Sequence, residues 1–179
     1  MTISRAAGTM TFPYQFMLVA AMNPTPDGKM PAESRSSPRE IQNYLGRISG
    51  PLLDRIDLHV EVPPVKFREM SAQAGGETSA TIRERVIASR SIQSKRFDGK
   101  IACNARMQSR DLQRHCALDD STRDLLKMAM EELDLSARAY DRILKVARTI
   151  ADLAGAESLG VEHVSEAIQY RSLDRQIWT

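Results

Sequence analysis

The stretch Ser136–Gly155, SARAYDRILKVARTIADLAG, decides the fold of the C-terminal part of this chain. Its apolar residues recur every three or four positions, which is the period of an α-helix that buries one face. Ser136 suits the N-cap of such a helix, and Gly155 suits the residue that ends one. The sequence therefore predicts a long amphipathic helix. Its buried stripe would comprise Tyr140, Ile143, Leu144, Ala147, Ile150, Ala151 and Ala154.

The opposite face of this helix is charged. Arg138 lies in its first turn, away from the apolar stripe, and the face continues through Lys145 and Asp152. We interpret Arg142 and Arg148 as residues that are solvated or lie at an interface, because amphipathic helices place their charges on the solvent side.

More helices are predicted on both sides of this stretch from N-cap residues and helical spacing. They run from Ile82 to about Phe97, from Ser109 through Cys116, from Asp120 or Ser121 onward, and from about Glu162 onward. Residues 81–179 are therefore predicted to form an all-α domain. The stretch SAQAGGETS precedes them, and its composition predicts a flexible linker over residues 71–80.

Residues 1–70 show a different pattern. TISRAAGTMTF alternates polar and apolar residues around Ala7 and Gly8, which predicts a hairpin. FMLVAAMNP, Phe16–Pro24, begins with a short unalternating apolar run, which predicts a strand buried on both faces in a parallel sheet. Ligands of such sheets bind at the carboxyl ends of the strands, where Asn23 stands.

A helix and a second strand are predicted next. Ser37 suits the N-cap, Pro38 the first helical position, and Glu40 completes a capping box. We expect this helix to run to the break at Gly50 and Pro51. A strand is then predicted from the alternation of Leu58, Val60 and Val62. These elements amount to a piece of an α/β layer, too small to be a complete sheet.

Composition excludes several classes of protein. The chain of 179 residues has a net charge of +2 and a pI near 8.6, so its charge is too small for a disordered polycation. No signal peptide or apolar run of spanning length occurs, so we expect a cytoplasmic protein with no membrane partner. Cys103, His115 and Cys116 lack the close Cys-x-x-Cys spacing of a zinc site, so we predict no metal site. His59 and His163 are interpreted as packed or surface residues.

The sequence also lacks the parts that usually hold a nucleotide. It contains no G-x-x-x-x-G-K-[ST] loop and no strand that ends in adjacent acids. That loop cradles phosphates with backbone N–H groups, and its lysine neutralises their charge. Taken alone, the chain should therefore bind nucleotide weakly or not at all.

Four stretches resemble one known family: FMLVAAMNP, IQNYLGRISGPLLDRIDLHVEV, LSARAYDRILKVARTIADLAG and HVSEAIQYRSLDR. They are similar to the C-terminal part of magnesium-chelatase-like AAA+ ATPases of the YifB/ComM type, and the likeness covers nearly the whole chain. The resemblance implies an α/β partial AAA+ core, holding the C-terminal part of a parallel sheet, followed by an all-α helical lid. It implies a fragment or a truncated gene product, with the phosphate loop and the acidic metal-binding motif upstream of Met1.

The resemblance assigns roles to three polar residues. Asn23 matches sensor 1, which positions the attacking water near the γ-phosphate. Arg55 matches the arginine finger that one subunit offers to its neighbour's ATP, with Arg47 as a second candidate. Arg138 matches sensor 2, which reaches from the lid to a phosphate in its own subunit. We regard Asn23 and Arg55 as catalytic candidates and Arg138 as a nucleotide-binding candidate.

Each role has a purely structural alternative. An Asn before Pro can simply end a strand. Arg55 could form a helix-end ion pair with Asp54 or Asp57, and Arg138 could merely solvate its helix face. Many relatives also carry a Cys-Pro-Cys-Gly-like loop after the sensor strand. The corresponding NPTPDGKMPAESRSSP has no cysteine, so no zinc is predicted there.

For the complete protein, the family implies ATP and Mg as cofactors and a homo-oligomeric ring, expected to be a hexamer. It also implies ATP hydrolysis coupled to DNA remodelling, of the branch-migration helicase kind that serves natural transformation. The stretch Arg83–Arg114 is rich in basic residues, and we name Arg106, Arg110 and Arg114 as candidate DNA contacts. Solvated helix faces also show such runs, so this alternative stays open.

Two other functions stay open. The chain could act alone, without enzymatic activity, as a DNA-binding or ring adaptor module that presents Arg55 to a separate ATPase subunit. The missing phosphate loop favours that idea. The family name also suggests a magnesium chelatase subunit that inserts magnesium into a porphyrin, although the matching motifs are those of the ComM-like branch.

Overall fold

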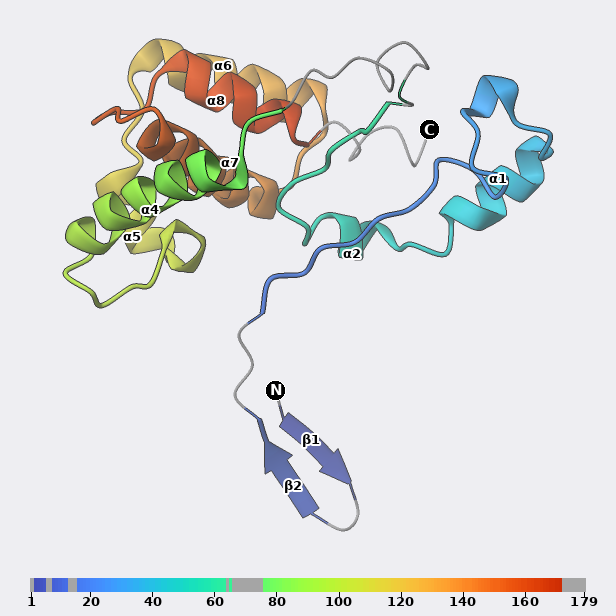
Figure 1. Cartoon of the computed structure of the whole chain (residues 1–179), viewed down its shortest axis with the longest axis horizontal. Coiled ribbons are helices and arrows are strands. Elements are labelled where there is room, and N and C mark those ends of the chain that lie inside the picture. The colour runs from blue at the N-terminus through green and yellow to red at the C-terminus, as the bar shows by residue number, and fades with distance from the viewer. Residues whose placement is uncertain (1, 6–7, 13–15, 64, 66–75, 172–179) are drawn as a thin grey trace. The chain divides into compact units, whose positions relative to one another are not determined.

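The computed structural model describes residues 2–5, 8–12, 16–63, 65 and 76–171. The chain divides into two compact units, Met1–Arg47 and Ile48–Thr179. The described residues are mostly helical, with one small sheet, and most of the helices belong to the second unit (Figure 1).

The first unit begins with a two-stranded antiparallel hairpin. Strand β1 (Thr2–Arg5) pairs with β2 (Gly8–Thr11), and Thr2 lies opposite Thr11. The hydroxyl groups of these two threonines are 3.1 Å apart, so a cross-strand hydrogen bond supports the register. The hairpin predicted from the alternating sequence is confirmed, although Ala7 in its turn lies outside the described residues.

The parallel strands predicted for residues 1–70 are not formed in the described part of the chain. Phe16–Met22 joins no sheet, and the side chains of Met17 and Val19 are 86% and 78% exposed. The predicted strand around Val60 is absent as well. An apolar strand becomes buried only when further strands and covering helices surround it, and the described residues place no strand beside either segment.

The helix predicted after Ser37 is confirmed. A short 3₁₀ turn, η1 (Pro31–Glu33), precedes α1 (Pro38–Leu45). The backbone N–H of Ser37 donates to the carboxylate of Glu40 at 2.7 Å, and the Ser37 hydroxyl accepts from the Glu40 N–H at 3.4 Å. These two bonds form the predicted capping box, which satisfies N–H groups at the start of the helix.

The same helix ends earlier than predicted. It stops at Leu45, and the following Gly46 forms its C-cap. The chain then starts a separate short helix, α2 (Gly50–Leu53), with Pro51 in its first turn. Proline is favoured at the start of a helix, because its fixed φ fits and its missing N–H is not needed there. The Gly-Pro pair therefore starts a helix here, where we predicted that it would only end one.

The second unit contains the predicted helices. They are α4 (Ser79–Arg96), α5 (Ser109–His115), α6 (Asp120–Glu132), α7 (Ala137–Leu153) and α8 (Val161–Gln169), with a 3₁₀ turn η2 (Asn104–Arg106). Helix α7 contacts α4, α5, η2 and α8, and is therefore the centre of the bundle (Figure 1). The Ser136 cap is confirmed, because its hydroxyl accepts from the Ala139 N–H at 3.2 Å.

The apolar stripe of α7 builds the core of this unit. Ile143, Ala147 and Ala151 are fully buried and pack with residues of the other helices. The surrounding buried residues include Phe97, Met107, Leu112, Cys116, Leu126, Leu159, Val164 and Ala167. Tyr140 is 40% exposed and Ala154 is exposed as well, so the prediction that these two belong to the buried stripe is wrong; Ala139 is buried instead.

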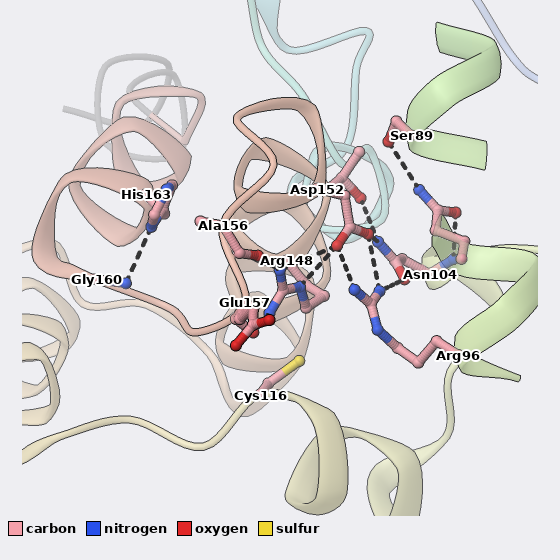
Figure 2. A network of polar contacts seen from close by, with 12 residues as sticks. Ser89, Arg96, Asn104, Cys116, Arg148, Asp152, Ala156, Glu157, Gly160 and His163 are labelled. Atoms are coloured by element: carbon pink, nitrogen blue, oxygen red, sulfur yellow. Dashed lines mark hydrogen bonds and ion pairs between the residues drawn. The ribbon is translucent and has the colours of Figure 1, made fainter. Parts of the chain in front are cut away.

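The charged face of α7 is also buried at its C-terminal end. Arg148 and Asp152 are each only 2% exposed, so our interpretation of Arg148 as a solvated or interface residue is wrong. Figure 2 shows the reason: Asp152 accepts hydrogen bonds from Arg96 of α4 and from Arg148, and at 2.8 Å from the side chain of Asn104 in η2. Arg148 also donates to the backbone oxygen of Ala156 at 2.6 Å. Every charge in this network has a partner, which is what makes its burial tolerable.

The network fixes the ionised state of its carboxylate. Burial by itself raises the pKa of Asp152, but hydrogen bonds from Arg96 and Asn104 and the charge of Arg148 outweigh it, so the pKa is lowered. A carboxyl whose pKa is lower in the folded state stabilises the fold above its unfolded-state pKa. This contribution is lost as the pH falls through the folded-state pKa.

We expect Asp152→Asn to lower the free energy of unfolding of this unit at pH 7 by about 3 kcal/mol, because the buried Arg148 and the partly buried Arg96 lose their counter-charge. Urea unfolding at pH 7 and at pH 3 measures the effect. The difference from the unchanged chain should narrow as the pH falls below about 4, where the carboxyl of the unfolded state takes up a proton while the native carboxylate is still ionised. Asp124→Asn removes an exposed acid and should change stability by less than about 0.5 kcal/mol. An equal loss for Asp152→Asn at both pH values would contradict this assignment.

Candidate functional site

Arg138 lies where the start of α7 meets the segment after α2. Its side chain is 65% exposed, and one guanidinium nitrogen is 3.6 Å from a carboxylate oxygen of Asp54. The neighbouring cap residue Ser136 donates its hydroxyl to the other oxygen of Asp54 at 2.8 Å. The N-terminal turn of α7 is thus held against Asp54, while Arg138 keeps most of its surface open to solvent.

A polar hollow of about 240 Å³ opens beside Arg138. Its lining comprises Asp57, Ala105, Arg138, Asp141, Arg142 and Lys145. Arg142 is tied by an ion pair to Asp57, and Lys145 donates to the backbone oxygen of Ala105 at 3.3 Å. Guanidinium and ammonium groups gathered in this way bind phosphate oxygens well. The hollow therefore suits a small anionic group.

Arg55 stands between two anchored acids. It follows α2, is exposed, and donates to the backbone oxygen of Pro51 at 2.6 Å. Its predicted structural alternative was an ion pair with Asp54 or Asp57. Among the described residues, Asp54 pairs with Arg138 and Arg171, whereas Asp57 pairs with Arg142. The guanidinium of Arg55 is thus exposed and available for another ligand.

The segment around Arg55 is docked on the helical bundle by the end of α8. The buried side chain of Arg171 donates to the backbone oxygen of Ile56, and the backbone N–H of His59 donates to the oxygen of Tyr170 at 2.8 Å. His59 is 6% exposed, as its interpretation as a packed residue requires. Sequence reasoning missed Arg171. The only available signal was a single arginine directly after an apolar helix face.

Asn23 lies in the first unit, in a loop and not at the end of a sheet strand. The residue is exposed. Its backbone oxygen accepts from the Tyr44 hydroxyl at 3.2 Å. A Cβ added at Gly28, which has a φ of +79°, would come within 3.5 Å of the Asn23 amide nitrogen. Gly28 therefore lies close to the Asn23 side chain without crowding it. Arg47, the second finger candidate, is exposed at the end of the same unit.

One carboxylate orders the loop that follows Asn23. Asp27 accepts from the Thr25 hydroxyl at 2.7 Å, from the Ser34 hydroxyl at 2.8 Å and from the Arg35 N–H at 3.0 Å. The Arg35 N–H, followed by the two hydroxyls, holds the pKa of Asp27 well below its ordinary value. Oxygen-rich side chains thus give this cysteine-free loop its shape.

The candidate DNA contacts lie on one part of the second unit. Arg106 belongs to η2, and Arg110 and Arg114 lie one turn apart on α5. All three are exposed, and no ion pair is found for any of them within the described ranges. They present unneutralised positive charge to solvent, as a phosphate-binding surface must.

The two cysteines differ in their surroundings. Cys116 is buried, and burial raises the pKa of its thiol to about 11. Cys103 is partly exposed. Within the described residues, no group of three or more His, Cys, Asp or Glu side chains is arranged to hold a metal ion.

Comparison with known sequences decides the family. Residues 76–171 match the family described as magnesium chelatase, subunit ChlI C-terminal, and residues 1–70 match magnesium chelatase, subunit ChlI. The chain belongs to the magnesium chelatase ChlI family. It is 47% identical to the competence protein ComM of Haemophilus influenzae, and 41% identical to the YifB proteins of Salmonella typhimurium and Escherichia coli. The resemblance to the YifB/ComM type is thus confirmed.

The alignments cover nearly all of this chain but only part of each relative. Each covers 97% of this chain but only 34% of the relative, so the chain spans about a third of the length of the proteins it matches. No helix among the described residues is long and apolar enough to cross a membrane.

We expect Cys116 to resist alkylation while Cys103 reacts. The thiolate is the reactive form, and a pKa of about 11 leaves almost none of it at pH 8. Iodoacetamide treatment at pH 8, followed by peptide mass analysis, should therefore label Cys103 first. In urea both cysteines should react at similar rates. Equal labelling of the two cysteines in the folded chain would contradict the burial of Cys116.

Proposed function

We propose that the chain is the C-terminal part of a ring-forming AAA+ ATPase that couples ATP hydrolysis to DNA remodelling. The observation that carries the proposal is the exposed pair of arginines, Arg55 and Arg138: Arg55 follows Asp54 in the sequence, and Arg138 pairs with Asp54 and lines a polar hollow that contains Arg142 and Lys145 as well as Asp57 and Asp141. Family membership supports it, as does the 47% identity to a relative named as a competence protein.

We propose the same division of the chain as the sequence predicted: 1–70 as the C-terminal part of the α/β core, 71–80 as a linker, and 81–179 as the helical domain. The change from one family match to the other between residues 70 and 76 supports this division. The exposed apolar run Phe16–Met22 supports it as well. Such a run has the composition of an inner strand, and it would be buried once the other strands of a sheet lie beside it.

In this proposal Asn23 is sensor 1, at the end of that strand, and its amide orients the attacking water. Arg138 is sensor 2, and its guanidinium binds a phosphate of the nucleotide in its own subunit. Arg55 is the arginine finger. Its permanent charge stabilises the negative charge that spreads over the transferred phosphoryl oxygens in the neighbour's site.

The residues present fit part of the ATP–magnesium complex. The cations of the hollow, Arg138, Arg142 and Lys145, suit its phosphates. The described residues offer no carboxylate cluster for magnesium, so we assign its ligands to residues outside this chain. Magnesium would neutralise phosphate charge when bound. A homo-oligomeric ring, proposed as a hexamer, would bring each Arg55 to the site of the next subunit.

We expect Arg55→Ala, made in the longer endogenous protein, to lower ATP hydrolysis by about three to five orders of magnitude and to leave ATP binding nearly unchanged. A finger acts on the transition state, which explains the difference. Initial rates and equilibrium binding of ATP measure the two effects. Arg47→Ala tests the second finger candidate in the same assay. Full hydrolysis by Arg55→Ala would remove Arg55 from this role.

The longer protein is identified first, by an immunoblot of cell extract with an antibody against this chain. A band much larger than 20.0 kDa supports the proposal. A band only at 20.0 kDa contradicts it. The alternative would then be a non-enzymatic adaptor that presents Arg55 to a separate ATPase subunit.

We expect the longer protein to bind DNA with an affinity that falls steeply as salt rises. Replacing Arg106, Arg110 and Arg114 together by glutamine should flatten the slope of log K against log salt by about three, one unit for each lost phosphate contact. Fluorescence anisotropy with labelled DNA measures the slope. Arg123→Gln is the matched control, because this exposed arginine is paired with Asp120. An unchanged slope for the triple variant would exclude these residues from the DNA contact.

A further inference from the structure

Asp54 directly precedes Arg55 in the sequence and forms an ion pair with Arg138. Its side chain, 23% exposed, accepts a hydrogen bond from Ser136 at 2.8 Å and lies 3.6 Å from Arg138 and 3.8 Å from Arg171. These partners come from the start of α7 and from the end of α8. One carboxylate therefore joins both helices to the segment whose next residue is Arg55.

The rest of this segment is held by the same helices. Arg171 also donates to the backbone oxygen of Ile56, Arg142 pairs with Asp57, and the oxygen of Tyr170 accepts from the N–H of His59. Four of the six residues from 54 to 59 are thus anchored on the helical bundle. The Arg55 side chain, in contrast, bonds back to its own segment at Pro51.

We propose that Asp54 is a positioning residue that couples Arg138 to Arg55. This inference rests on the nucleotide and finger roles proposed above for these arginines. Through Ser136 and Arg171, Asp54 fixes the segment that aims Arg55. Through its ion pair it also competes with a phosphate for the guanidinium of Arg138.

The strengths of these contacts fit a coupling device. The Arg138 side chain is 65% exposed in its 3.6 Å contact, and exposed ion pairs of this kind are weak, whereas Arg171 is buried in its 3.8 Å contact. A phosphate can therefore take Arg138 away from Asp54 at little cost. The contacts of Asp54 to Ser136 and Arg171 remain. The segment from residue 54 to 59 therefore stays bound to the helical bundle, but it has lost its contact to Arg138. A nucleotide in the subunit's own site would in this way loosen the segment that carries the finger for the next site.

The first test uses this chain and needs no catalysis. Hydrogen exchange of the His59 amide reports the docking, because its N–H donates to the Tyr170 oxygen. We expect Asp54→Asn to speed this exchange about tenfold relative to the Ala151 amide in the core of α7. A general loss of stability would speed the exchange of both amides, so the ratio of the His59 rate to the Ala151 rate reports the local docking alone. Asp141→Asn is the matched control, since Asp141 lines the same hollow but makes no hydrogen bond or ion pair to the segment among the described residues. An unchanged ratio for Asp54→Asn would overturn the proposal.

The second test uses the longer protein and separates kcat from ATP affinity. We expect Asp54→Asn to lower kcat about tenfold, because the finger is less well aimed, and to leave ATP affinity equal or up to about fivefold tighter, because Arg138 is released. Asp54→Glu keeps the charge and should restore most of kcat. A parallel loss of kcat and ATP affinity would indicate a structural role only and overturn the inference. If Arg55→Ala has no effect, the proposed function fails; if Arg55→Ala is inactive but Asp54→Asn is fully active, only the coupling fails.

Discussion

The helical unit depends on a single buried carboxylate, that of Asp152. It receives Arg96 from α4, Asn104 from η2 and Arg148 from its own helix, so three segments separated in sequence meet at one charge. Burying charges in this way is costly unless all of them are paired, and the geometry here pairs them. The apolar packing of α7 supplies most of the driving force, while the network specifies how α4 and η2 lie against it.

The carboxylates of Asp152 and Asp54 differ in how firmly their partners are held, and this difference bears on the proposed function. Around Asp152 the contacts are short and the side chains are buried, so the arrangement is fixed. Around Asp54 the contact to Arg138 is long and exposed, so the arrangement can change when another anion arrives. The same helix, α7, contributes to both arrangements. Its C-terminal half forms a rigid support, and its first turn presents a charge that can exchange partners.

Much of the helical part could be predicted from the sequence, because local signals coincide there. The cap at Ser136, the glycine at 155 and the spacing of Ile143 and Ala147 all indicate one helix, and neighbouring sequence suffices to form it. The burial of Arg148 could not be predicted. Arg148 is bonded to Asp152, which also accepts from Arg96 and Asn104, 56 and 48 positions from Asp152 in the sequence, whereas helix periodicity alone places Arg148 on a polar face. The docking of Arg171 was missed for the same reason, since its partner Ile56 is distant in sequence.

The predicted parallel strands of residues 1–70 are not formed among the described residues, although their sequence pattern is clear; the reason is physical. A parallel strand has no stability of its own, because its hydrogen bonds and its apolar contacts both come from other segments. Phe16–Met22 has the composition of such a strand, but the described residues place no strand beside it. The proposed sensor 1 role of Asn23 relies on the same missing neighbours, whereas the placement of Arg55 and Arg138 relies on contacts within the second unit.

The exposed run Phe16–Met22 has a consequence for how this chain behaves by itself. Several large, exposed apolar side chains in succession, with no charge among them, are features that promote association between molecules. In solution such a segment would template aggregation, and its tendency would grow with concentration.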